Sequence, residues 1–265
     1  MNPELLAAIR RLNPVVLTVA NAVTIAEVAN AVNAIGASPI MSKAPEEAPE
    51  LVGLAGGVTL NLGTWTKAQV DQMVAVGQAA NQAQVPVVID PVAVALPKRQ
   101  QIFTNLVEQV QPSIIRANAG EMAFLAGEDD TTRGIDATDL TVNHALVAAE
   151  VAKRFNCIAV MTGKKDFISD GTKTFVVHNG TTLFATHVGS GDMLSSVLGA
   201  FLAVSEDALT AAVTGTAIFA ATGQWVAQTA QLSNQQPGTF AVKLMDGLAA
   251  VSMTDLKSLL EVEVN

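Results

Sequence analysis

The sequence predicts a three-layer α/β/α fold in which helices cover both faces of a central, mainly parallel sheet. Short β-branched runs alternate along the chain with segments whose apolar residues recur at helical spacing, which is typical of strand–helix–strand units. The runs lack the clean alternation of a half-exposed strand, as expected when both faces are covered. Half of the 265 residues are hydrophobic, and no charged linker or change in composition divides the chain. We therefore expect a single domain over residues 1–265.

The expected elements follow one another in a regular order. Residues 14–21 begin as a buried strand, and Thr24 with Glu27 predicts a capping box for a helix that ends at Gly36. Residues 37–41 are expected to be extended, because their proline excludes Ser38 from the helical region. Further strands are expected over residues 57–63, 85–92, 113–118 and 157–163, and further helices from Thr66 onward, over 102–110 and over 140–155.

The last third of the chain has a different pattern. The Asp-Gly pair inside Asp166–Gly180 lies between two β-rich runs and predicts a hairpin at one edge of the sheet. Beyond Gly189 the pattern is mostly helical. The uncharged stretch 208–242 is interrupted by glycines and polar residues, which favours a helix buried in protein over a membrane span.

The charge balance excludes several classes of partner. The net charge is −9 and no cluster of Lys and Arg is present, so we expect no binding to nucleic acid or to anionic membranes. The N-terminal segment lacks the apolar core of a signal peptide. The single cysteine, Cys157, excludes an internal disulfide and fits a reducing compartment. These features predict a cytoplasmic protein.

The sharpest chemical signal is the stretch "GSGD", Gly189–Asp192, which precedes a long apolar run. The glycines let backbone amides approach an anion, and Ser190 is expected to cap a helix whose N-terminus favours negative charge. Asp192 then lies in the first turn and has two interpretations. One is a capping acid, which the helix dipole favours by about 0.3–1 kcal/mol. The other is a general base that accepts the proton of a hydroxyl attacking phosphorus.

Polar side chains stand at the expected carboxyl ends of the strands, where ligands bind in an open parallel sheet. These residues are Asn21, Asp90, Arg116, Asn118 and Thr162. Asn118 and Glu121 lie three apart and offer oxygen ligands that suit Mg²⁺, usually through waters. The same pair also fits an N-cap asparagine with a capping-box glutamate. Asp90 precedes Pro91, so it either starts a turn or supplies a carboxylate to a metal or phosphate site.

The remaining candidates are isolated residues. His144 is expected on a helix surface and His178 in a hairpin strand, while His187 lies close enough to the glycine turn to touch a ligand. No His/Cys pair has the spacing of metal ligands. Cys157 opens an apolar strand and is expected to be buried. Met41 follows a strand end, so it either belongs to the core or lines an apolar pocket.

Taken together, six stretches in the correct order resemble the hydroxyethylthiazole kinase family, whose members have the ribokinase-like fold. The stretches are "NAVTIAEVANAVNAIGASPIMSKAPEE", "LNLGT", "VVIDPV", "IIRANAGE", "VMTGKKDFISDG" and "GSGDMLSSVLGAFLAV". The resemblance covers Asn21 to about Val204 and implies an ATP- and Mg²⁺-dependent kinase that phosphorylates 4-methyl-5-(2-hydroxyethyl)thiazole for thiamine synthesis. It also implies a homotrimer with active sites at the subunit interfaces.

The resemblance also assigns roles to residues of this chain. It implies that Asn21, Met41 and Gly189 contact the thiazole and that Arg116, Thr162 and Gly191 contact ATP. Asp90, Asn118 and Glu121 would support Mg²⁺ and the phosphates. Asp192 would be the base, at a position where the family usually has cysteine and the wider ribokinase-like group has aspartate. Threonine is usual in the family at Val188, the family's "ITN" is "VAN" here, and its preceding histidine is Leu17.

Two other functions remain compatible with these residues. The first is a ribokinase-like kinase for another small alcohol, of the hydroxymethylpyrimidine or pyridoxal type. The second is a non-catalytic metabolite-binding protein on the same fold. Asp192, Asn118 and Glu121 argue against the second alternative, because a protein that only binds a metabolite has no need of a base.

Overall fold

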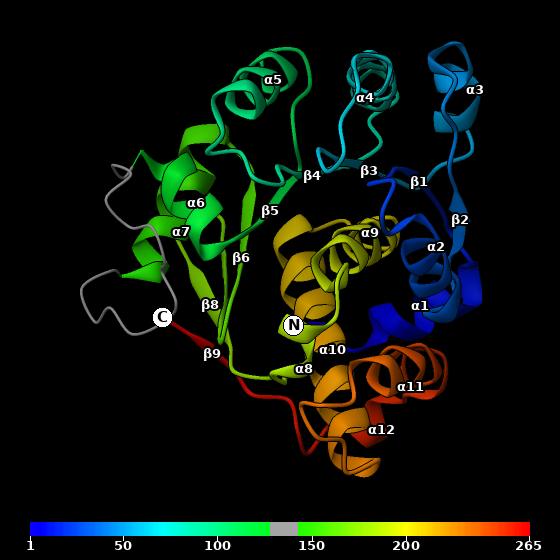
Figure 1. Cartoon of the computed structure of the whole chain (residues 1–265), viewed down its shortest axis with the longest axis vertical. Coiled ribbons are helices and arrows are strands. Elements are labelled where there is room, and N and C mark those ends of the chain that lie inside the picture. Colours follow the sequence, from blue (N-terminus) through cyan, green and yellow to red (C-terminus); the bar gives the residue numbers. More distant parts are fainter. Residues whose placement is uncertain (128–142) are drawn as a thin grey trace.

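One continuous sheet forms the middle layer of the molecule (Figure 1). The computed structural model describes residues 1–127 and 143–265, so residues 140–142 of the helix expected over 140–155 lie outside it. In the described residues nine strands are ordered β2-β1-β3-β4-β5-β6-β7-β8-β9. The strands from β2 to β6 run parallel, whereas β7, β8 and β9 are antiparallel to their neighbours. Their bounds are β1 Val15–Val19, β2 Ser38–Ile40, β3 Gly57–Asn61, β4 Val87–Asp90, β5 Ile114–Asn118, β6 Ile158–Thr162, β7 Asp166–Ser169, β8 Thr174–Val177 and β9 Val262–Val264.

Helices cover both faces of the sheet (Figure 1). One face carries α1 Glu4–Leu12, α2 Ile25–Ala34, α8 Leu183–Thr186, α9 Ser190–Leu202, α10 Ala208–Thr229, α11 Pro237–Ala250 and α12 Met253–Leu256. The other face carries α3 Ala48–Val52, which follows the 3₁₀ turn Pro45–Glu47, and then α4 Lys67–Gln82, α5 Pro97–Val107, α6 Ala119–Ala126 and α7 His144–Phe155. Each face has its own apolar core against the sheet. The predicted three-layer α/β/α fold is therefore confirmed.

The order of the strands locates the ligand-binding edge. From β1 the chain first passes through α2 to β2 on one side, and then returns to β3 on the other side and continues to β6. The direction of winding therefore changes between β1 and β3. In open α/β sheets, ligands bind beyond the carboxyl ends of the strands at such a change of direction.

Helix α9 packs directly over β1, β3 and β4. A methyl group at Gly57 in β3 would collide with the backbone carbonyl of Gly199 in α9, so helix and strand approach as closely as backbones allow. Next to this contact, the Thr59 hydroxyl donates to the Ser195 carbonyl oxygen at 3.3 Å. Together these contacts fix the position of α9 along the sheet, and with it the position of its first turn.

The predicted antiparallel hairpin at one end of the sheet is confirmed, and a further short strand extends that end. Strands β7 and β8 pair around the turn at Asp170 and Gly171 as expected. The edge of the sheet is β9, the short strand Val262–Val264, which pairs with β8. The uncharged stretch begins with α10, which is largely buried, in agreement with the prediction. None of the helices described is long and apolar enough to cross a membrane.

The predicted capping box at Thr24 and the predicted cap at Ser190 were wrong. Thr24 is the N-cap of α2, but its side chain makes no capping hydrogen bond and donates instead to Asp192 Oδ2 at 2.5 Å. The N-cap of α9 is Gly189, with a left-handed φ of 94°, rather than Ser190. The Ser190 hydroxyl donates to the His187 carbonyl oxygen at 2.9 Å. The Thr24 hydroxyl thus binds a distant helix, and the Ser190 hydroxyl binds the preceding loop, instead of capping their own helices.

The close approach of α9 and β3 makes a stability prediction. Gly57→Ala should lower the free energy of unfolding by about 1–3 kcal/mol or more, because two backbones must separate to admit the methyl group. Gly238→Ala in α11 is the matched control. A Cβ there meets nothing within 4 Å, so alanine should stabilise the protein slightly through its helix propensity. Urea unfolding of both variants measures the difference, and equal stability of the two would contradict the packing described here.

Candidate active site

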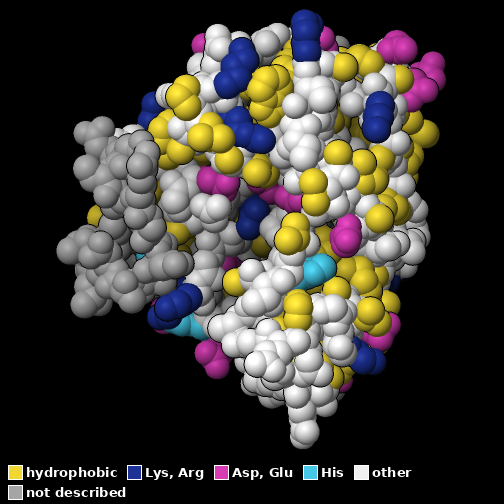
Figure 2. Space-filling view, viewed as in Figure 1, with side chains coloured by type: hydrophobic (Ala, Val, Ile, Leu, Met, Phe, Trp, Pro, Cys, Tyr) yellow, Lys and Arg dark blue, Asp and Glu magenta, His cyan; other side chains and the backbone are white. Residues whose placement is uncertain are grey.

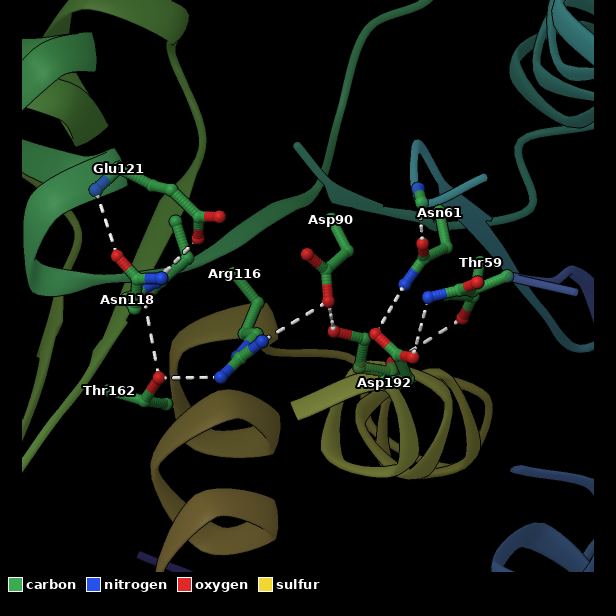
Figure 3. A network of polar contacts seen from close by, with 12 residues as sticks. Thr59, Asn61, Asp90, Arg116, Asn118, Glu121, Thr162 and Asp192 are labelled. Carbon is green, nitrogen blue, oxygen red and sulfur yellow. Dashed lines mark hydrogen bonds and ion pairs between the residues drawn. The ribbon is translucent and has the colours of Figure 1, made fainter. Parts of the chain in front are cut away.

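Polar side chains from five strands and two helices meet at the carboxyl edge of the parallel sheet (Figure 3). Asp192 lies there in the first turn of α9. Asp90, Arg116 and Thr162 come from the ends of β4, β5 and β6, and Asn21 follows β1. Figure 2 shows acidic and basic side chains next to one another in a hollow near the middle of this face of the molecule. The prediction that residues distant in sequence gather at this edge is confirmed by the contacts described below.

Three donors hold the carboxylate of Asp192. Asn61 Nδ2 donates to Oδ1 at 2.9 Å, and Oδ2 accepts from Asn21 Nδ2 at 3.2 Å and from Thr24 Oγ1 at 2.5 Å. An ionised carboxylate can only accept hydrogen bonds, so this arrangement suits the charged form and fixes its plane. The charge also lies at the N-terminus of α9, where the helix dipole favours it.

The two asparagines are oriented by their own neighbours. Asn61 Oδ1 accepts from the backbone N–H of Gly63 at 2.7 Å, which leaves the amide nitrogen to face Asp192. Asn21 Oδ1 accepts from the hydroxyl of Thr64 at 3.0 Å and from the backbone N–H of Val23 at 3.1 Å. Each amide therefore presents its NH₂ group to the carboxylate because its oxygen is already engaged.

Arg116 connects Asp90 with Thr162. Its Nη1 lies 3.2 Å from Asp90 Oδ2, and its Nη2 donates to the Thr162 hydroxyl at 2.6 Å. The guanidinium group also lies against Gly191, where any Cβ would collide with it. The glycine thus brings the start of α9 and a fixed positive charge together, which is a suitable arrangement for binding phosphate oxygens.

Asp90 is fully buried, and its two carboxylate oxygens differ. Oδ2 accepts from Ser195 Oγ at 2.6 Å as well as from Arg116, whereas Oδ1 is buried without a hydrogen-bond partner among the described residues. Burial raises the pKa of Asp90 to about 6; Arg116 lowers it, and the nearby carboxylates of Glu121 and Asp192 raise it further. The cluster therefore holds more negative charge than Arg116 alone offsets, which favours a bound cation.

Asn118 and Glu121 form the capping box that was one of their two interpretations. The backbone N–H of Glu121 donates to Asn118 Oδ1 at 2.9 Å, and that of Asn118 donates to Glu121 Oε2 at 3.0 Å. Glu121 Oε1 accepts from the backbone N–H of Ala93 at 2.7 Å. Each of these side-chain oxygens of Asn118 and Glu121 keeps a second lone pair. The capping box therefore does not prevent them from also supporting Mg²⁺, which stays a prediction.

The other predicted residues lie in different surroundings. Met41 follows β2 and packs, partly buried, against the apolar core beneath α2 and α9, so its contact with a substrate stays a prediction. A Cβ at Gly189 would collide with the methyl group of Thr24. Cys157 is buried, as expected. No group of three or more His, Cys, Asp or Glu side chains able to hold a metal is found within residues 1–127 and 143–265.

The three histidines lie outside this network. His144 begins α7 and its ring contacts Phe167. His178 follows β8, and its Nε2 lies 2.7 Å from Glu263 Oε1 in β9. His187 precedes the glycine turn, with its ring 6.5 Å from that of Phe240.

Sequence reasoning missed Thr24, Asn61 and Ser195 as members of this network. Asn61 had a readable signal, because it lies near the end of the strand predicted over residues 57–63, as Asp90 does in the strand predicted over 85–92. Ser195 lies three residues after Asp192 and so shares a helix face with it. Thr24 gave no such signal, because a threonine just before a helix is already explained as its N-cap.

This arrangement of strands and helices is the ribokinase-like α/β fold. A ribokinase-like superfamily protein from Enterococcus faecalis superimposes with a TM-score of 0.64 at 13% identity, covering 89% of this chain and 88% of that chain. That likeness concerns the fold alone.

A more specific relationship follows from the other comparisons. The model of the hydroxyethylthiazole kinase family matches residues 6–254. A hydroxyethylthiazole kinase from Levilactobacillus brevis is 46% identical over 259 residues, which are 97% of this chain and 98% of that protein. The solved structure of a hydroxyethylthiazole kinase from Pyrococcus horikoshii has a TM-score of 0.89 at 30% identity, over 99% of this chain and 98% of that chain. The chain belongs to the hydroxyethylthiazole kinase family.

Asp166, at the start of β7, is a further buried acid near the site. It is 8% exposed, and its Oδ1 accepts from the backbone N–H of Gly163 at 3.0 Å, closing the turn after Thr162. Burial raises the pKa of Asp166 to about 7, against the opposing effects of the Gly163 hydrogen bond and of Arg116. The folded protein therefore binds this proton more tightly than the unfolded chain does.

The raised pKa of Asp166 makes a pH-dependent prediction. The stability that its protonation contributes is complete below the unfolded pKa of about 4 and is lost as the pH rises through about 7. Asp166→Asn keeps the acceptor for Gly163 and stays neutral. It should therefore be more stable than the wild type at pH 8, by on the order of 1–4 kcal/mol. The gain should shrink toward zero near pH 4, and thermal unfolding across this range measures it. A difference that does not vary with pH would contradict the raised pKa.

Proposed function

We propose that the protein transfers the γ-phosphoryl group of ATP to the hydroxyl of 4-methyl-5-(2-hydroxyethyl)thiazole, in the salvage route to thiamine. The observation that carries this proposal is the carboxylate of Asp192, fixed by Asn21, Thr24 and Asn61 at the N-terminus of α9. Membership of the hydroxyethylthiazole kinase family supports the choice of substrate.

Asp192 is the general base in this proposal. Its carboxylate accepts the proton of the substrate hydroxyl while the oxygen attacks the γ-phosphorus, so that the nucleophile does not become a charged oxonium. A positioned base of this kind contributes about 10²–10⁴ in rate. The first backbone N–H groups of α9 have no acceptor within the helix, and they stabilise the negative charge that shifts onto the phosphate oxygens.

Arg116, Thr162 and Gly191 bind the phosphates of ATP. The guanidinium group is held in place by Asp90 and Thr162, so it does not have to be ordered when the nucleotide binds. The absence of a side chain at Gly191 lets this charge lie at the start of α9. A fixed positive charge at the start of α9 supports this role, because phosphoryl transfer depends on electrostatic stabilisation of the phosphate oxygens.

The residues present also fit a Mg²⁺ ion. The fit rests on Asp90 Oδ1, a buried carboxylate oxygen without a partner in the described part of the chain. Asp90, Asn118 and Glu121 would hold the ion, in part through waters, which is the usual arrangement for magnesium beside substrate phosphates. When bound, the ion neutralises phosphate charge.

Asn21, Met41 and Gly189 contact the thiazole in this proposal. Two exposed valines lie next to this part of the site: Val23 precedes Thr24 and is 64% exposed, and Val188 precedes Gly189 and is 71% exposed. Apolar side chains this open beside a binding site suit a surface that a second subunit covers. This supports a homotrimer with shared active sites.

The proposal also includes the domain organisation of the chain and its cellular compartment. Strands from the first and last parts of the sequence belong to one sheet, which supports one kinase domain over residues 1–265. The need for ATP and the single buried cysteine favour the cytoplasm.

An assay of ADP release with a panel of alcohols tests the substrate. The hydroxyethylthiazole should give the highest kcat/KM, above hydroxymethylpyrimidine and pyridoxal, and excess chelator should abolish turnover. A higher kcat/KM for another alcohol would still show a kinase, but one with that alcohol as its substrate. Tight thiazole binding without any ADP release would instead show a binding protein.

Sedimentation tests the assembly. We expect a trimer at micromolar concentration, because the proposed active sites are shared between subunits and the exposed Val23 and Val188 beside the site offer an apolar contact for a neighbour. A protein that sediments as a monomer and still turns over at the full rate would contradict the shared active site.

A further inference from the structure

Two neighbouring serines of α9 face the sheet from inside the protein. Ser195 is 0% exposed and Ser196 is 1% exposed. The Ser195 hydroxyl donates to Asp90 Oδ2 at 2.6 Å, while the Ser196 hydroxyl pairs with Thr18 Oγ1 at 3.2 Å. Both hydroxyls therefore join the same helix to the same sheet, but only the first contacts an ionisable group.

The contact of Ser195 makes the two oxygens of Asp90 unequal. Oδ2 is engaged by Ser195 and Arg116, and Oδ1 is buried without a partner among the described residues. In Figure 3 the unengaged oxygen lies on the side of Asp90 away from α9. A buried carboxylate oxygen without a partner is costly, so its presence indicates a ligand that binds there.

We infer that Ser195 is a positioning residue that holds Oδ2 of Asp90, so that Oδ1 is presented to the divalent cation of the reaction. This inference rests on the proposed kinase function, which supplies the cation. Ser195 itself touches neither the substrate nor the ion. Groups that orient a metal ligand in this way typically change metal affinity by about 10–100-fold when they are removed.

Arg116 cannot replace Ser195 in this role. Its Nη1 contact with Asp90 is longer, at 3.2 Å, and the same guanidinium binds Thr162 and lies where ATP phosphates are proposed to bind. Arg116 Nε is also buried without a partner in the described residues. Without the serine hydroxyl, the carboxylate is free to turn toward the guanidinium and withdraw Oδ1 from the cation.

Direct binding of Mn²⁺ in the presence of ADP tests this role without relying on turnover. Electron paramagnetic resonance of free Mn²⁺ gives the dissociation constant for the wild type, Ser195→Ala and Ser196→Ala. Ser195→Ala should bind Mn²⁺ at least about tenfold more weakly. Ser196→Ala is the matched control: it loses an equally buried hydroxyl from the same helix and should stay within about twofold of the wild type.

Conservative variants separate positioning from packing. Ser195→Thr keeps the hydroxyl and should bind Mn²⁺ nearly as well as the wild type. Should Ser195→Ala fail to fold, Ser195→Cys replaces it, because the thiol keeps the size of the side chain but donates only weakly. The cysteine variant should then show the weakened binding.

Different results would contradict the role of Ser195 and the proposed kinase function. Equal Mn²⁺ affinities in Ser195→Ala and Ser196→Ala, with normal binding by the wild type, would overturn the role of Ser195 alone. Failure of the wild type to bind Mn²⁺ with ADP would overturn the cation site of the proposed function and this inference together.

Discussion

The site depends on the close packing of α9 against β1, β3 and β4. Gly57 and Gly199 let strand and helix backbones touch, and the hydroxyl of Thr59 binds the helix backbone beside that contact. A helix held at several points cannot slide or rotate, so its first turn is fixed at the carboxyl edge of the sheet. Because that turn carries Asp192 and Gly191, the packing of an otherwise apolar helix decides where the proposed base and the proposed phosphate-binding amides lie.

The polar side chains of the site are ordered before any ligand binds. Three side chains of the network are each oriented by a neighbour: Gly63 orients Asn61, Thr64 orients Asn21, and Thr162 with Asp90 orients Arg116. Such order lowers the reorganisation that charge transfer to phosphate would otherwise require. The buried negative charge of Asp90 requires compensation, and Arg116 and Ser195 supply part of it at Oδ2. Within the described residues Oδ1 has no partner, which leaves room for a bound cation.

Much of the fold could be predicted from the sequence because it is encoded by local patterns. The β-branched runs and helical spacing identified the parallel strands and their helices, and the topology rule brought Asp90, Arg116 and Thr162 to one edge. The failures have a common physical cause. Thr24 and Ser190 carry the local signature of helix caps, yet Asp192 and the His187 carbonyl compete successfully for their hydroxyls. Strand β9 is three residues long and forms only against β8, so its own sequence carries too little signal.

The most direct test of this account is the turnover of Asp192→Asn, which keeps the size of the side chain and removes its ability to accept a proton. If Asp192 is the base, kcat of the folded variant should fall by about 10²–10⁴, whereas the affinity for ADP should change little. The melting temperature should fall somewhat, because the asparagine NH₂ group faces a donor that the carboxylate accepted from. Asp192→Cys, the residue usual in the family, should have a kcat between those of the wild type and the asparagine variant. A kcat of Asp192→Asn within about threefold of the wild type, far short of the loss expected for a base, would show that Asp192 only stabilises the start of α9.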